Sequence, residues 1–165
     1  MFNWAAIMPV FDNFWSWALQ RWQDGDLARA LLALQEEQDV VVLEVMLLAW
    51  LGREGWLIDE EGHRKLVAAG RPWVRGVVVP LRNTRQAWRG DDSLNPQRGR
   101  LQRLELQAEA ELGRLYFETL AELRLDVADG HPSDSLAANI RHTLDGCAGG
   151  NMDASRLTLV ELLSR

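Results

Sequence analysis

The segment from Val40 to Leu51 constrains the fold of this chain more than any other. Its twelve residues include one polar side chain, Glu44, so a helix through them is apolar on every side. Such a helix belongs either in the centre of a bundle or in a membrane. Twelve residues are too few for a membrane span, which needs about 20. The sequence therefore predicts a buried central helix over about 40–54, capped by Asp39 and ended by Gly55.

Helical periodicity also occurs on both sides of this segment. Leu27, Leu31 and Leu34, for example, recur at the spacing of one helix face. No stretch alternates clearly enough to predict a strand. The chain is therefore predicted to be all-α, a bundle of seven or eight helices around the central one, with its longest helix at about 96–125. The other predicted helices cover about 12–23, 26–38, 59–69, 72–88, 135–144 and the residues after Asp153.

We predict that residues 1–165 form a single domain, since no repeat or low-complexity linker divides them. Residues 1–11 form an N-terminal arm and 127–165 a C-terminal helical extension. The glycine-rich turn at 146–151 is expected to let the last helix move.

The charge of the chain is negative overall but unevenly distributed. The net charge of −6 argues against generic binding to nucleic acid or to anionic membranes. Between Arg82 and Arg103, however, six arginines face only Asp91 and Asp92. The N-terminus does not resemble a signal peptide or an anchor, and a single cysteine fits a reducing compartment. We therefore expect a cytoplasmic protein without a membrane span.

Two glutamates of the longest predicted helix lie on its apolar side. Glu105 and Glu109 are one turn apart, and a carboxylate removed from water requires a partner. Arg82 and Arg85 lie on the flank of the buried stripe of the preceding helix. We expect the two pairs to face each other, because guanidinium and carboxylate form bidentate hydrogen bonds. The cluster is either a structural salt bridge or a polar pocket for a small ligand.

Aromatic residues near the N-terminus are candidates for a partner surface. Trp17 lies off the apolar stripe of its helix, and Trp4 lies in the N-terminal arm. Together with Arg89 in the arginine-rich connection, they are predicted to contact a protein partner, unless the arm folds back and buries the tryptophans.

The sequence contains no recognisable catalytic or metal-binding motif. It has no phosphate-binding loop, nucleophile elbow or zinc signature. His63 lies beside Arg64 and Lys65 and is expected to be exposed, while His142 and Cys147 have no metal-ligand spacing. We therefore predict no catalytic residue, no metal and no cofactor.

Five motifs occur in a defined order along the chain: F-W-S-W-A-L at 14–19, A-L-L-A-L-Q ending at Gln35, W-L-G at 50–52, V-x-P-L-R-x-x-R at 78–85 and E-L-Q-A-E at 105–109. With these motifs, residues of about 14–117 resemble an uncharacterised bacterial all-helical family of unknown function. The resemblance implies that the two arginines and two glutamates of the cluster belong to the family pattern. Where that family has an Asp-Val-Asn run, this chain has Val41, Val42 and Leu43, which implies that a polar site built on that run is incomplete here.

These observations favour a non-catalytic cytoplasmic binding or adaptor protein with an unidentified protein partner. One alternative is a small-ligand-binding or enzymatic helical bundle whose pocket lies at Arg82, Arg85, Glu105 and Glu109. A second alternative is an RNA- or ribosome-associated protein that uses the region from Arg82 to Arg103. Oligomeric state is left open by the sequence.

Overall fold

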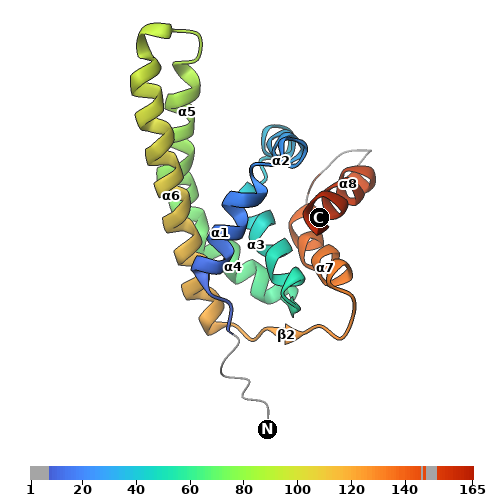
Figure 1. Ribbon diagram of the computed structural model, residues 1–165. Helices are drawn as coiled ribbons and strands as arrows, with labels where there is room; N and C mark the ends of the chain where they lie inside the picture. Colours follow the sequence, from blue (N-terminus) through green and yellow to red (C-terminus); the bar gives the residue numbers. More distant parts are fainter. Residues whose placement is uncertain (1–7, 146, 148–151) are drawn as a thin grey trace. The chain divides into compact units, whose positions relative to one another are not determined.

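The computed structural model describes residues 8–145, 147 and 152–165, and it confirms the all-α prediction (Figure 1). Among these residues the helices are α1 (Phe11–Arg21), α2 (Gly25–Gln38), α3 (Val42–Arg53), α4 (Glu60–Trp73), α5 (Val79–Ala87), α6 (Asn95–Glu122), α7 (Pro132–Leu144) and α8 (Met152–Ser164). Among the described helices, none is both long and apolar enough to cross a membrane.

The chain divides into two compact units. The first comprises Met1–His63 and Leu123–Arg165, and the second, which we name the hairpin unit, comprises Arg64–Glu122. The single-domain organisation stays a prediction.

The predicted central helix is α3, in the first unit. All ten residues from Leu43 to Gly52 are buried, as expected for a helix that is apolar on every side. Its most extensive contact is with α7, and α1, α2 and the segment Trp56–Leu57 also pack against it. The C-terminal extension therefore supplies a large part of the cover, because α7 packs on α3 and α8 contacts both α7 and α2. Most of the predicted mobile turn, residues 146 and 148–151, lies outside the described residues.

The ends of α3 differ in part from the prediction. Asp39 does not cap α3: it adopts a left-handed conformation with φ of 55° at the end of α2, and Val41 precedes α3 without a side-chain cap. Gly55 does follow the helix end, with φ of +84°, a conformation that favours glycine. It leads into a short antiparallel pairing that the sequence did not predict, in which β1 (Trp56–Leu57) lies beside β2 (Asp126–Val127).

Residues 60–87 form one uninterrupted helical run, so the predicted break between 69 and 72 is wrong. Pro72 lies inside α4, and α4 continues into a π-helical turn at Val74–Val78 and then into α5. In this turn the N–H of Val79 donates to the carbonyl of Val74, five residues earlier. A wider turn accommodates Pro80, which has no N–H and whose ring would clash with a carbonyl four residues before it.

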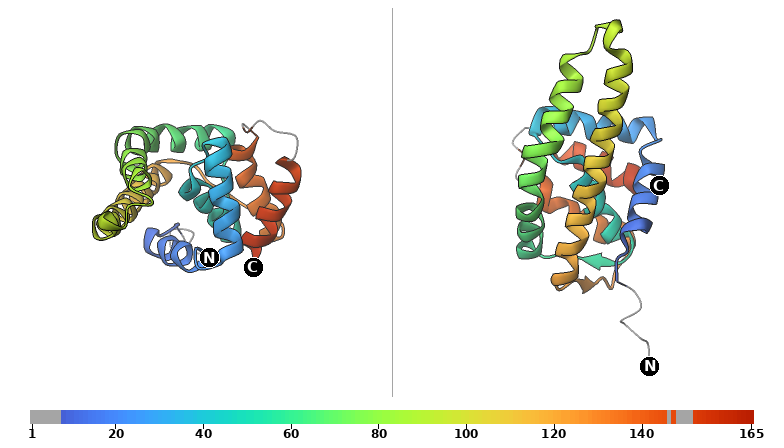
Figure 2. Two further views of the ribbon diagram at one scale, coloured as in Figure 1. Left: turned by 90° about the horizontal axis from the view of Figure 1, so that it is seen from above. Right: turned by 90° about the vertical axis from the view of Figure 1, so that its left-hand side faces the viewer.

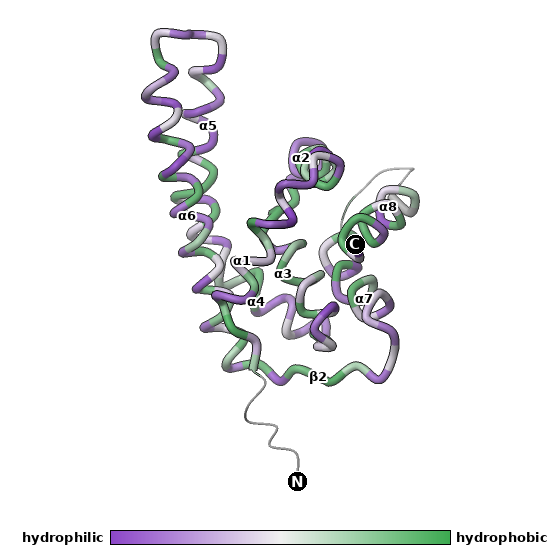
Figure 3. Tube along the Cα trace, viewed as in Figure 1, coloured by the Kyte–Doolittle hydropathy of each residue, from purple (hydrophilic) through white to green (hydrophobic). Residues whose placement is uncertain are grey.

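The hairpin unit consists mainly of this run and the antiparallel helix α6. Figure 2 shows α5 and α6 lying side by side, joined by a short connection that includes a 3₁₀ turn at Asp92–Leu94. In the tube of Figure 3 the connected end of the hairpin is mostly hydrophilic. Buried side chains of the unit include those of Val78, Ala108, Leu112 and Tyr116. The long helix predicted at 96–125 is confirmed as α6, with bounds shifted by a few residues.

Candidate functional site

The hairpin unit brings Arg82, Arg85, Glu105 and Glu109 together. Arg82 Nε donates to Glu105 Oε1 at 2.9 Å, and a terminal nitrogen of Arg82 donates to Glu109 Oε1 at 3.1 Å. Arg85 Nε donates to Glu105 Oε2 at 2.6 Å, with a longer contact from its terminal nitrogen to Oε1 at 3.4 Å. Both oxygens of Glu105 therefore accept from arginines, as expected for charge-assisted pairing.

The two carboxylates of this cluster differ in their surroundings. The Glu105 side chain is 9% exposed and lies between both arginines, whereas Glu109 is 30% exposed and, among the described residues, pairs with Arg82. Burial raises the pKa of the Glu109 carboxyl; Arg82 opposes this shift, and Glu105 adds to it. The pKa of Glu109 is thus raised although a cation lies beside it.

The closed pairing favours a structural salt bridge over a ligand pocket. A pocket for an anion requires guanidinium groups whose donors are not already directed at carboxylates. Here Arg82 bridges Glu105 and Glu109, and Arg85 is held by Glu105. The two arginines lie on α5 and the two glutamates on α6, so the cluster links the two helices of the hairpin.

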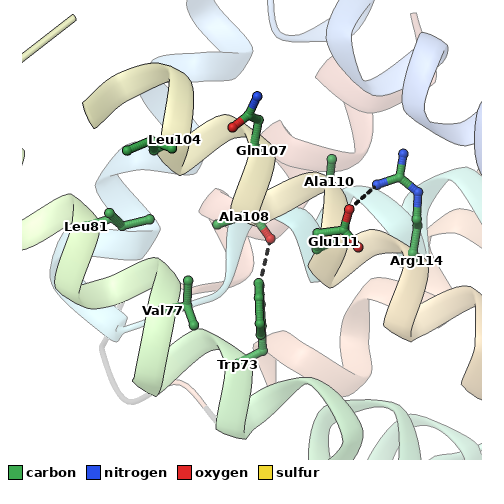
Figure 4. A pocket seen from close by; sticks show the side chains of 9 residues that line it. All are labelled: Trp73, Val77, Leu81, Leu104, Gln107, Ala108, Ala110, Glu111 and Arg114. Carbon is green, nitrogen blue, oxygen red and sulfur yellow. Dashed lines mark hydrogen bonds and ion pairs between the residues drawn. The ribbon is translucent and has the colours of Figure 1, made fainter. Parts of the chain in front are cut away.

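A groove lies elsewhere on the hairpin unit (Figure 4). It is open to solvent, has a volume of about 570 Å³ and is lined by Trp73, Val77, Leu81, Leu104, Gln107, Ala108, Ala110, Glu111 and Arg114. Trp73 Nε1 donates to the carbonyl of Ala108 at 2.8 Å, so the indole ring is fixed in place. Leu104, an apolar residue at one end of the groove, is 48% exposed.

The predicted partner residues lie in different environments. Arg89 is exposed beyond the end of α5. Trp17 is half-buried against Phe14, with ring centroids 6.4 Å apart, so it offers only part of its ring to a partner. Trp4 lies outside the described residues. Of the two that are described, Arg89 has the more accessible side chain.

A polar cluster that sequence reasoning missed occurs in the first unit. Glu44, the polar residue of the central helix, is buried, and its Oε1 lies 3.1 Å from both His63 Nε2 and Thr143 Oγ1. His63 is 14% exposed, so the prediction that it is exposed was wrong. His63 lies in the first turn of α4, within the first unit. Its side chain contacts Glu44 of α3 and Thr143 of α7. The signal in the sequence was Glu44 itself, because a buried carboxylate requires a partner.

This cluster resembles a nucleophilic triad in composition but not in geometry. In a triad the hydroxyl and the acid contact opposite nitrogens of the imidazole, so that one nitrogen accepts the hydroxyl hydrogen. Here Thr143 Oγ1 and Glu44 Oε1 both lie 3.1 Å from the same nitrogen, His63 Nε2. A nitrogen that donates to the carboxylate has no lone pair left for the hydroxyl. The arrangement therefore holds three elements together but does not activate Thr143.

Two neighbouring side chains extend the network to the β1 segment. The ring of His142 stacks on that of His63 with centroids 5.4 Å apart, and its Nε2 donates to the carbonyl of Ile58 at 2.9 Å. Asn139, fully buried, accepts from the N–H of Ile58 and donates to the carbonyls of Leu48 and Trp56. These contacts give hydrogen-bond partners to backbone groups of Trp56 and Ile58 at the short strand and add a donor to the carbonyl of Leu48 in α3.

In the part of the chain that is described, the remaining metal-ligating and nucleophilic side chains form no metal site or catalytic site. No group of three or more His, Cys, Asp or Glu side chains is placed there to hold a metal ion. Burial raises the pKa of the Cys147 thiol, with Arg156 opposing the shift, which disfavours the nucleophilic thiolate.

The comparison with known proteins agrees with the sequence motifs. Residues 13–115 match the family described as "protein of unknown function (DUF2390)", which confirms the resemblance predicted for about 14–117. No curated protein and no solved structure matches the chain. The matched residues include all four members of the arginine–glutamate cluster and Glu44 and His63, but not Thr143 or Asn139.

Proposed function

We propose that this chain, which belongs to the DUF2390 family of proteins of unknown function, is a non-catalytic cytoplasmic binding protein that holds an acidic segment of a protein partner. The partner would dock on three arginines at the connected end of the hairpin unit, Arg89, Arg98 and Arg103, which we name the basic end. The proposal rests on the positive net charge of the hairpin unit.

The two units carry opposite net charge. Residues 64–122 contain eleven Arg and Lys against seven Asp and Glu, a formal charge of +4. The rest of the chain contains seven basic and seventeen acidic residues, a formal charge of −10. A positively charged surface on an otherwise acidic protein attracts acidic partners and raises their association rate.

The arginines of the basic end are available for such a partner. Arg89 and Arg103 are exposed, and Arg98 is half-buried with one hydrogen bond to Asn95 at 3.2 Å. Among the residues that the structure describes, none of the three pairs with a carboxylate, in contrast to Arg82 and Arg85. Guanidinium groups bind carboxylates through paired hydrogen bonds, which suits an Asp- or Glu-rich peptide.

A protein partner fits this end better than RNA does. Single-stranded RNA is held by stacking on exposed aromatic rings, and the aromatic residue nearest the connection, Trp88, is half-buried. The charge of −10 on the remainder of the chain also repels a long polyanion, whereas a short acidic segment contacts the basic end alone.

The geometry of the polar clusters supports a function without catalysis. The carboxylates of the hairpin cluster accept from arginines, and the Glu44, His63 and Thr143 cluster lacks a free base nitrogen beside the hydroxyl. The cytoplasmic assignment is part of the proposal and rests on the single cysteine, which fits a reducing compartment.

Photo-crosslinking in the host cell tests this proposal. A benzophenone amino acid replaces Gln97, an exposed residue in the first turn of α6. The expected adduct is removed by protease and not by nuclease, and it disappears when Arg89, Arg98 and Arg103 are all changed to Glu. The protein in the adduct, once purified, should bind the unmodified chain at least about 10-fold more tightly than the triple variant.

The control variant is Arg124→Glu, which changes a side chain that is 94% exposed in the other unit and should leave the adduct unchanged. A nuclease-sensitive adduct would replace the proposed partner by RNA. An adduct that survives the triple reversal, or no adduct, would show that the basic end is not the docking surface.

A further inference from the structure

The outer face of α6 has a pattern that matches a second copy of itself. This face consists of eight residues at helical spacing, all exposed: Arg100, Arg103, Leu104, Gln107, Glu111, Arg114, Glu118 and Glu122. It borders the groove of the hairpin unit, which contributes Trp73, Val77 and Leu81 from the preceding helical run. A polar face would need no partner, but Leu104 and the groove add apolar surface to it.

The charges of the outer face are divided along the helix. Arg100 and Arg103 lie toward its N-terminus, while Glu118 and Glu122 lie toward its C-terminus. The central Arg114 and Glu111 bond to each other at 2.8 Å. Two parallel copies of α6 would place like charges together. Two antiparallel copies place the arginines near the N-terminus of each α6 against the glutamates near the C-terminus of the other.

The α6 residues that line the groove are also compatible with an antiparallel arrangement of two copies. These residues are 104, 107, 108, 110, 111 and 114, which are arranged evenly about position 109. A two-fold axis at the level of residue 109, passing through the outer face opposite the Glu109 side chain, would therefore place Gln107 of one copy beside Glu111 of the other, and Arg100 beside Glu118. Leu104 would lie at the Arg114 end of the partner's groove, near Trp73. Interfaces of two-fold dimers are self-complementary in this way.

We propose that two copies of this chain associate through the outer faces of α6, antiparallel about the level of residue 109, with Leu104 of each copy entering the groove of the other. Two helical hairpins packed in this manner form a four-helix arrangement. The face is small and largely polar, so the association is a weak one, with a dissociation constant of about 1–100 μM. It goes beyond the proposed function, because it uses the outer face of α6, which shares only Arg103 with the basic end.

Sedimentation velocity over a range of protein concentrations tests the association. The mass of the unmodified chain should rise from 18.7 kDa toward twice that value as concentration increases. Leu104→Glu should abolish the rise, because it buries a charge in the apolar groove. Leu157→Glu, at a side chain on α8 that is 72% exposed, is the matched control and should leave the rise unchanged. A mass of 18.7 kDa at every concentration would overturn the proposal.

Charge reversal tests the antiparallel register. Arg100→Glu and Glu118→Arg should each weaken association by about 5- to 10-fold, since each places like charges together twice in the dimer. The double variant carries both reversals and should restore association, which an effect on folding would not do. Failure of the double variant to recover, or a dimer unaffected by Leu104→Glu, would exclude this interface. All of these variants retain Arg89, Arg98 and Arg103, so an adduct at position 97 that persists in Leu104→Glu reports on the basic end and not on the dimer.

Discussion

Gly52 of α3 lies directly against the backbone of Leu136 in α7. A Cβ placed on Gly52 would be 2.4 Å from both the Cα and the N of Leu136. Because no real contact is that short, the two helices approach as closely as they do only through the missing side chain. This explains the glycine at the end of the W-L-G motif, and it fixes the most extensive helix contact of the first unit.

Gly52→Ala should be strongly destabilising. The added methyl meets backbone atoms of α7, which cannot rotate away, so the helices must separate at a cost of about 3 kcal/mol or more. Urea unfolding of the purified variant measures the loss. Gly76→Ala is the matched control, since a Cβ there meets nothing within 4 Å and should change stability by less than about 1 kcal/mol. Similar losses in both variants would contradict the close approach of α3 and α7.

Glu105→Ala should destabilise the protein far more than Glu111→Ala. Removing Glu105 leaves Arg82 and Arg85 partly buried without their main partner, which costs about 2–3 kcal/mol. Glu111 is 57% exposed and pairs with Arg114 at the surface, so its removal should cost less than about 1 kcal/mol. Chemical denaturation of the two variants side by side measures the difference. Equal effects would show that the cluster contributes no more than a surface ion pair.

Glu109→Gln should change how stability depends on pH. Since burial raises the pKa of Glu109 in the folded state, the folded protein binds this proton more readily than the unfolded chain. The contribution of Glu109 is therefore present below its ordinary pKa and lost as pH rises through the raised value. The stability of Glu109→Gln relative to the unmodified chain should improve as pH rises from about 4 through the raised pKa of Glu109. Denaturant midpoints across this range measure the trend, and a relative stability that falls with pH would give the opposite sign.

Asn139→Ala should destabilise the first unit. The amide accepts from the N–H of Ile58 and donates to the carbonyls of Leu48 and Trp56, and its removal leaves the buried N–H of Ile58 without this partner. The expected loss is about 3 kcal/mol. Asn83→Ala, at an exposed position of α5, should change stability by less than about 0.5 kcal/mol. Thermal unfolding followed by circular dichroism compares the two, and a small effect at Asn139 would show that water replaces the amide.

Several features of the fold and of the cluster were determined by the sequence itself. The central helix was predictable because Val40 to Leu51 is apolar in every direction, and burial on all sides is the stable arrangement for such a helix. The pairing of Arg82 and Arg85 with Glu105 and Glu109 was predictable for a related reason. Charges on the apolar side of adjacent helices must meet a partner, and a short connection brings those two helices together.

Other features were decided by the tertiary structure alone. Pro72 and Pro80 predict helix ends or kinks locally, yet packing of the hairpin favours one continuous run, and a π-helical turn makes it possible. Glu44 meets His63 and Thr143, which lie 19 and 99 residues away along the chain. Gly52 contacts a helix more than 80 residues downstream, and Asp39 ends α2 instead of capping α3. Periodicity reveals which face of a helix is buried, but only the packed structure determines which distant residue lies against it.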